Sequence, residues 1–133
     1  MKDLEWGEVL SVEVDEIDND HKKLLDLFNI LTHALSDGES QEYLKAVFNE
    51  LVNCTIWHFS HEERLMLKYG YENLEEHKEA HQELVQAAWE LQDKLFQLDK
   101  TITEDDLVEL ERWLTGHILT DDMKLGEYLS QVM

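Results

Sequence analysis

Histidines and acidic residues are spaced along this chain in pairs that could bind metal ions. His58 and Glu62 are four residues apart, and so are His77 and His81. On a helix, residues four apart lie on the same face, one turn above the other. Each pair can therefore direct two ligand atoms toward one point. Between the pairs, Gly70 and Asn73 can end one helix and begin the next, so the stretch resembles a helical hairpin that carries half of a metal site.

Apolar residues recur at steps of three and four along four segments, which predicts four helices. The first begins near residues 18–20 and ends near 36–38, and the others cover about 41–69, 74–98 and 104–122. The third stripe ends at Leu98. Short connections favour an all-α, antiparallel, up-down-up-down four-helix bundle. Residues 1–17, anchored by Trp6, are expected to form an extended N-terminal arm, and residues 123–133 a short C-terminal helix.

The apolar stripes of the predicted helices contain most of the histidines. Five of the seven lie on these stripes: His21, His58, His77, His81 and His117. A single buried histidine is ordinarily a hydrogen-bonded core residue, but five would need partners for both nitrogens of every ring. Metal coordination satisfies them in one step, because neutral imidazole binds iron, zinc and copper. His33 is off its stripe and is expected to be exposed, whereas the position of His61 beside a stripe leaves its role open.

Carboxylates complete the predicted site. Glu62 occupies a position where leucine is expected, and a buried carboxylate without a partner is costly unless it binds a metal. Near the end of the fourth helix, Asp121 fits the spacing from His117 better than Asp122 does. Asp122 can be a ligand only if the helix is distorted there or if its side chain reaches around. Five imidazoles and two carboxylates exceed the needs of one tetrahedral zinc and indicate a two-metal centre with one open position.

These spacings resemble those of the hemerythrin family, specifically the single-domain bacteriohemerythrins. The resemblance rests on His58-x3-Glu62, His77-x3-His81 and His117-x4-Asp122, and on the local sequences HFSHEERLM and WLTGHILTDD. It covers nearly the whole chain, so we expect residues 1–133 to form one hemerythrin-like domain. The resemblance departs at Glu72, where the family often has proline in the turn.

The resemblance also implies a set of cofactors and ligands. These would be two iron ions joined by an oxo or hydroxo bridge, with dioxygen as the exogenous ligand. One iron would be held by His77, His81 and His117 and the other by His21 and His58, with Glu62 and Asp122 bridging. This assignment favours Asp122 over Asp121.

By the same resemblance, the protein would bind dioxygen reversibly for transport or storage and would not be an enzyme. O2 would enter at the iron held by two histidines, in a dry, apolar pocket. The residues expected to line it, each within about one turn of a ligand, are Phe59, Trp113, Leu114 and Ile118. A di-iron oxidase or ferroxidase is one alternative, although no glutamate here is followed by histidine at i+3 as in ferritin-like sites. A sensor of O2, redox state or iron that acts through a partner is another.

Composition limits the partners. Eleven basic and 31 acidic residues give a formal charge of −20, which disfavours nucleic acids and anionic membranes and favours a monomer. Cys54 is the single cysteine and is interpreted as a small core residue, so no intrachain disulfide is expected. The sequence shows neither a signal peptide nor an apolar membrane span, and a cytoplasmic location is expected. Besides dioxygen, a partner enzyme that consumes O2 is a candidate.

Overall fold

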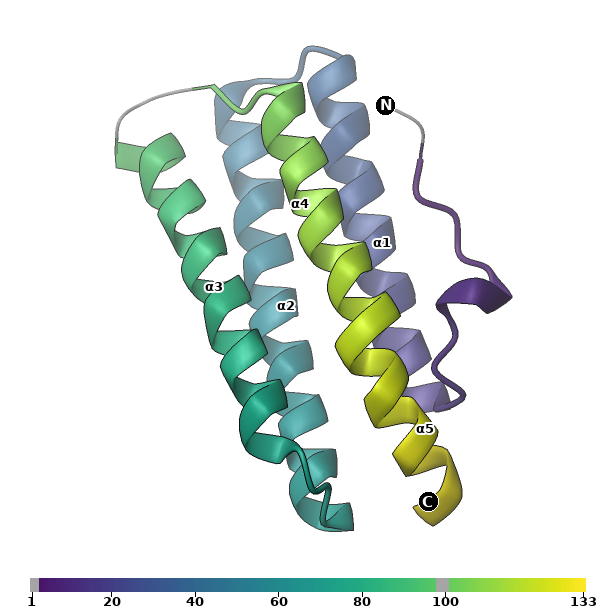
Figure 1. Ribbon diagram of the computed structural model, residues 1–133. Helices are drawn as coiled ribbons and strands as arrows, with labels where there is room; N and C mark the ends of the chain where they lie inside the picture. The colour runs from purple at the N-terminus through teal and green to yellow at the C-terminus, as the bar shows by residue number, and fades with distance from the viewer. Residues whose placement is uncertain (1–2, 98–100) are drawn as a thin grey trace.

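The computed structural model of this chain describes residues 3–97 and 101–133. Four helices lie side by side in alternating directions: α1 (Asp15–Ser36), α2 (Gln41–Tyr69), α3 (Leu74–Gln97) and α4 (Glu104–His117) (Figure 1). The last of these continues through a π-helical turn, η2 (Ile118–Asp122), into α5 (Met123–Val132). Across the described residues every regular element is helical, so the predicted four-helix bundle with a short C-terminal helix is confirmed. The expected end of the third stripe at Leu98 falls outside the described residues.

The helix ends follow from local chemistry. The Ser40 side chain accepts a hydrogen bond from the Tyr43 amide at 3.1 Å and so caps the first turn of α2. Gly70 ends α2 with φ of +66°, a left-handed conformation that glycine adopts without steric cost. Thr103 and Asp106 form a reciprocal capping box at the start of α4. These ends agree with the boundaries predicted from sequence.

The start of α1 was predicted too late. The helix begins at Asp15 rather than at residues 18–20, and the Asp18 amide already donates to the Val14 carbonyl. Ile17, which was assigned to the predicted arm, is fully buried one turn before His21 and belongs to the apolar stripe of the helix. The acids of the first turn are favoured at the positive end of the helix dipole, but no polar cap residue marked this start.

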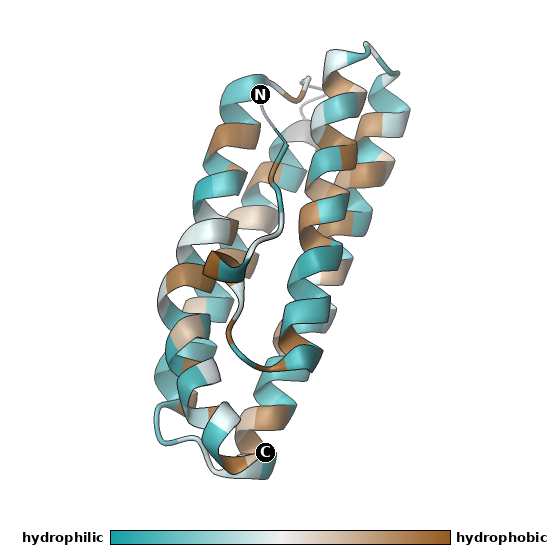
Figure 2. Cartoon of the chain, turned by 90° about the vertical axis from the view of Figure 1, so that its right-hand side faces the viewer, coloured by the Kyte–Doolittle hydropathy of each residue, from teal (hydrophilic) through white to brown (hydrophobic). Residues whose placement is uncertain are grey.

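The N-terminal arm runs along the outside of the bundle, as expected (Figure 2). It contains a 3₁₀ turn, Glu8–Leu10, and Leu4 exchanges two hydrogen bonds of 2.8 Å with the Asn29 side chain. Val12 and Val14 are buried, whereas Trp6 is only half-buried beneath the Lys22 ammonium. The two valines and Leu4 therefore fix the arm to the bundle together with Trp6.

The apolar core consists of two clusters that follow one another along the length of the bundle. One includes Leu24, Phe28 and Phe48, and the other includes Ile17, Leu65 and Leu125. His21 lies between Leu24 and Ile17 on α1, so a polar layer separates the two clusters. No helix in the described part of the chain combines the length and apolar character needed to cross a membrane.

Candidate metal centre

The polar layer contains every metal ligand predicted from the sequence. All seven are buried, with at most 7% of any residue exposed. They come from all four helices and the π turn: His21 on α1, His58 and Glu62 on α2, His77 and His81 on α3, His117 on α4, and Asp122 in η2. Their ligand atoms form two overlapping groups, each compact enough to hold one metal ion.

Glu62 lies between the two groups. Its Oε1 is 2.9 Å from Nε2 of His81 and 3.2 Å from Nε2 of His77. Its Oε2 is 3.2 Å from Nε2 of His58 and 3.8 Å from Nε2 of His21. Each carboxylate oxygen therefore faces a different set of histidines, which is the arrangement that a bridging ligand requires.

Asp122 spans the same two sets. Its Oδ1 is 3.1 Å from Nε2 of both His77 and His117, and its Oδ2 is 2.8 Å from Nε2 of His21. The two carboxylates thus divide the imidazoles into a group of three and a group of two. One group contains His77, His81 and His117 with Glu62 and Asp122, and the other contains His21 and His58 with the same two carboxylates.

The π turn explains how Asp122 reaches the centre. A π-helix has its hydrogen bonds at i→i+5, so residues five apart come onto one face. Asp122 is fully buried, while the side chain of Asp121 is 39% exposed and its Oδ2 lies 3.1 Å from Nδ1 of His117. Of the two alternatives that the sequence left open for Asp122, the helix distortion is the one present, and Asp121 contacts the outer nitrogen of His117 instead.

Metal ions would satisfy the donor atoms of this cluster better than hydrogen bonds among those atoms do. Glu62 Oε2, His117 Nε2 and both Asp122 oxygens are buried and, although imidazole nitrogens or carboxylate oxygens lie close to them, none has a partner in hydrogen-bonding geometry. Buried carboxylate oxygens left in this state are costly, and bound cations remove the cost. The Nε2 atoms of His21 and His58 also converge to 3.1 Å. Imidazole nitrogens and carboxylate oxygens in this proportion suit iron.

Electrostatics couple the imidazoles to the carboxylates. Burial alone would lower the pKa of His58, but Glu62 and the hydrogen bond to Asp20 raise it to about 10. The same opposition between burial and the neighbouring carboxylates raises the pKa of His77 to about 9. Burial and Asp122 would raise the pKa of Glu62, but His58 and His77 lower it to about 2. In the metal-free protein, protons therefore occupy positions that metal ions would take.

A further set of carboxylates contacts the outer nitrogens of the histidines. Nδ1 of His81 lies 3.0 Å from Glu63, and Nδ1 of His58 lies 2.8 Å from Asp20. Together with Asp121 behind His117, these acids fix the ring orientation so that Nε2 faces inward. None of the three was predicted in this role from the sequence, in which Asp121 was considered only as a possible metal ligand. Each immediately precedes or follows a ligand residue in the sequence, and that adjacency was the available signal.

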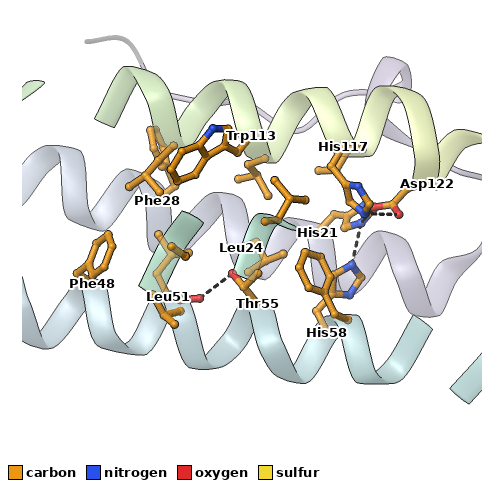
Figure 3. A pocket seen from close by; sticks show the side chains of 17 residues that line it. His21, Leu24, Phe28, Phe48, Leu51, Thr55, His58, Trp113, His117 and Asp122 are labelled. Atoms are coloured by element: carbon orange, nitrogen blue, oxygen red, sulfur yellow. Dashed lines mark hydrogen bonds and ion pairs between the residues drawn. The ribbon is translucent and has the colours of Figure 1, made fainter. Parts of the chain in front are cut away.

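The predicted pocket residues lie beside the polar layer. Phe59, Trp113, Leu114 and Ile118 all line a cavity of about 60 Å³. His21, His58, His117 and Asp122 stand at one end and Phe48 at the other (Figure 3). The Phe59 ring stacks on His81 with centroids 3.9 Å apart. The cavity is therefore apolar along its length and polar at the candidate centre.

The two remaining histidines, His33 and His61, differ in exposure. His33 is exposed, as expected, and it pairs with Asp3. His61, whose role the spacing left open, is buried and contacts Asp20. Cys54 is half-buried against the larger apolar cluster, in agreement with its interpretation as a small core residue.

Comparison with known proteins identifies the family. The family model described as "Hemerythrin HHE cation binding domain" matches residues 12–129. This chain belongs to the hemerythrin family. It is 33% identical over 122 residues to the bacteriohemerythrin of Pseudomonas paraeruginosa, covering 92% of this chain and 78% of that protein. It is 31% identical over 113 residues to the bacteriohemerythrin of Methylococcus capsulatus, covering 85% and 86%.

Solved structures agree with this assignment. A wild-type hemerythrin crystal structure superposes with a TM-score of 0.88 at 27% identity, covering 96% of this chain and 98% of that one. Hemerythrins bind a di-iron centre, and the buried cluster of histidines and carboxylates in this chain is able to hold metal ions. Family and fold together indicate non-haem di-iron chemistry and dioxygen binding.

Proposed function

We propose that this protein carries or stores dioxygen by binding it reversibly at a di-iron centre held by the seven buried residues. The observation that carries the proposal is the division of the histidines by Glu62 and Asp122 into three and two. With both carboxylates shared, the position held by His21 and His58 has one protein ligand fewer than its neighbour. That difference leaves room for a small ligand on one side.

The apolar cavity also indicates that dioxygen would enter at the position held by His21 and His58. Both histidines of the pair, His21 and His58, line the cavity, whereas His117 is the one histidine of the group of three that does. When bound, the two iron ions would supply the electrons that dioxygen needs in order to bind. The task of the chain is to hold the ions at fixed positions and keep water out. Phe59, Leu114 and Ile118 would do the latter, because they surround the cavity with side chains that offer water no hydrogen bond.

A carrier is favoured over an enzyme by the donor set. Ferritin-like oxidases hold their metals with Glu-x-x-His pairs and are rich in carboxylates. Here five imidazoles and two carboxylates make up the two groups. A centre with fewer anionic ligands should stabilise high-valent iron less well, which favours binding O2 over splitting it.

The experiment is repeated oxygenation of the iron-loaded protein. The ferrous protein, prepared without oxygen, is exposed to air and then flushed with argon over several cycles while its absorption spectrum is recorded. A carrier gains a new absorption band in air and loses it under argon with the iron still ferrous. Irreversible oxidation in the first cycle, or catalytic O2 consumption with an added reductant, contradicts the proposal.

A further inference from the structure

Behind His58, two imidazoles share one carboxylate oxygen. Oδ2 of Asp20 is 2.8 Å from Nδ1 of His58 and 2.6 Å from Nδ1 of His61. Nε2 of His58 faces the candidate centre, 3.2 Å from Glu62, so its Nδ1 is the nitrogen that donates to Asp20. His61 is 8% exposed and contributes to neither of the two metal groups around Glu62 and Asp122. Its burial is therefore not explained by metal binding at the centre.

This arrangement differs from those behind the other histidines. Glu63 behind His81 and Asp121 behind His117 are 26% and 39% exposed, so water also solvates them. The side chain of Asp20 is only 11% exposed. A carboxylate with little water around it interacts more strongly with its hydrogen-bond donors. Asp20 should thus affect its histidine more than the other two carboxylates affect theirs.

His61 is held in place from the protein surface. The Trp57 ring lies over it with centroids 5.5 Å apart, and Glu16 Oε1 is 3.5 Å from its Nε2. Trp57 is 59% exposed, and the Glu16 side chain is 53% exposed. A substitution at His61 therefore removes its hydrogen bond to Asp20 at the edge of the bundle. It leaves the apolar core and the seven candidate ligands unchanged.

We propose that Asp20 and His61 are positioning residues that set the electron donation of His58 to the adjacent iron in opposite directions. The inference rests on the proposed di-iron function. A carboxylate that accepts the Nδ1–H of a metal-bound imidazole makes the ring a stronger ligand and favours oxidised iron. His61 donates to the same oxygen, which weakens the hydrogen bond from His58. Asp20 therefore stabilises oxidised iron, and His61 moderates that effect.

The test compares variants that change one donor or one charge each. Asp20→Asn retains an acceptor oxygen but removes the charge. His61→Leu removes the second donor, and His61→Asn restores an N–H group near the position of Nδ1. His33→Leu is the matched control, because it removes an exposed imidazole that also pairs with an aspartate. Iron content is measured first, and the midpoint potential of each iron-loaded protein is then determined by spectroelectrochemistry.

The two substitutions should move the midpoint potential in opposite directions. Asp20→Asn should raise it, His61→Leu should lower it, and His61→Asn and His33→Leu should leave it near the wild-type value. Shifts of the same sign in Asp20→Asn and His61→Leu, or no shift in either, overturn the inference. Fewer than two iron ions in the wild type contradicts the proposed function instead, so the two failures are distinguishable.

A second measurement requires neither iron nor a correctly folded Asp20→Asn variant. In the zinc-loaded protein, proton NMR observes the Nδ1–H of His58 directly. His61→Leu should move this resonance downfield, because the remaining hydrogen bond to Asp20 becomes stronger, and His61→Asn should return it toward the wild-type position. An unchanged resonance in His61→Leu overturns the inference.

Discussion

His117 and Asp122 are five residues apart, yet both direct side-chain atoms to the same point, with Nε2 and Oδ1 3.1 Å apart. The π-helical turn Ile118–Asp122 between them produces this relationship. In an uninterrupted α-helix the residue on the face of His117 would be Asp121. One extra residue in the turn therefore decides which of two neighbouring aspartates enters the core, and π turns of this kind are often found at functional sites.

The neighbouring aspartates should consequently respond differently to substitution. Asp122→Ala removes the carboxylate that spans both groups, and the protein should bind fewer than two metal ions. Asp121→Ala removes only the hydrogen bond to His117 and should keep two ions with affinity reduced about tenfold. Metal analysis after equilibrium dialysis measures both. Equal losses in the two variants would contradict the assignment of Asp122 to the centre.

Leu114 should keep water from the centre. Leu114→Ala enlarges the apolar cavity beside His117, and oxygenated protein should then oxidise irreversibly several times faster. Leu119→Ala is the matched control, because Leu119 is 46% exposed and does not line the cavity. Decay of the oxygenated spectrum in air gives the rate. An unchanged rate in Leu114→Ala would count against this role.

The metal-free protein should lose stability as pH rises. The pKa of His58 is raised to about 10 from an ordinary 6.5, so its contribution is complete below about pH 6.5 and is lost as pH rises through about 10. His77, with its pKa raised to about 9, acts in the same direction. The lowered pKa of Glu62, about 2, stabilises the fold above its ordinary value of 4.5, and this contribution is lost as pH falls through about 2.

Urea unfolding at about pH 5.5 and about pH 9.5 tests this dependence. The metal-free protein should have the larger free energy of unfolding at the lower pH. The metal-loaded protein should show the reverse order, because protons compete with metal ions for the imidazoles. The same pH dependence in both forms would show that the imidazoles do not exchange protons for metal.

Two glycines should respond in opposite ways to a methyl group. A Cβ at Gly126 would collide with the carbonyl oxygen of Val12 in the N-terminal arm. Gly126→Ala should therefore displace the arm and destabilise the protein by about 1–3 kcal/mol. A Cβ at Gly116 meets nothing within 4 Å, and Gly116→Ala should stabilise it by about 0.5–1 kcal/mol. Thermal unfolding measures both. Equal effects would contradict the packing of the arm on α5.

The burial and convergence of the candidate ligands could be predicted because they follow from helix periodicity. His21, His58, His77 and His81 replace apolar residues at steps of three and four, and such positions face the core. Asp122 did not obey that rule, and the resemblance to a family favoured it where spacing favoured Asp121. The π turn is a small change in backbone hydrogen bonding, and no residue type marked it in advance.

The residues behind the ligands could not be predicted from periodicity. Asp20, Glu63 and His61 lie beside the stripes, where a polar side chain is ordinarily solvated. His61 is buried where α1 and α2 place Asp20 against it at 2.6 Å and the Trp57 ring covers it. The start of α1 was missed for a related reason, because Val14 precedes it and offers no side-chain cap.

The most direct test of the account is an anaerobic titration of the metal-free protein with ferrous iron, followed by exposure to air and then argon. The protein should saturate at two iron ions per chain, develop an absorption band in air, and lose that band under argon. Saturation at one ion or none, or a spectrum that argon does not reverse, would contradict the account.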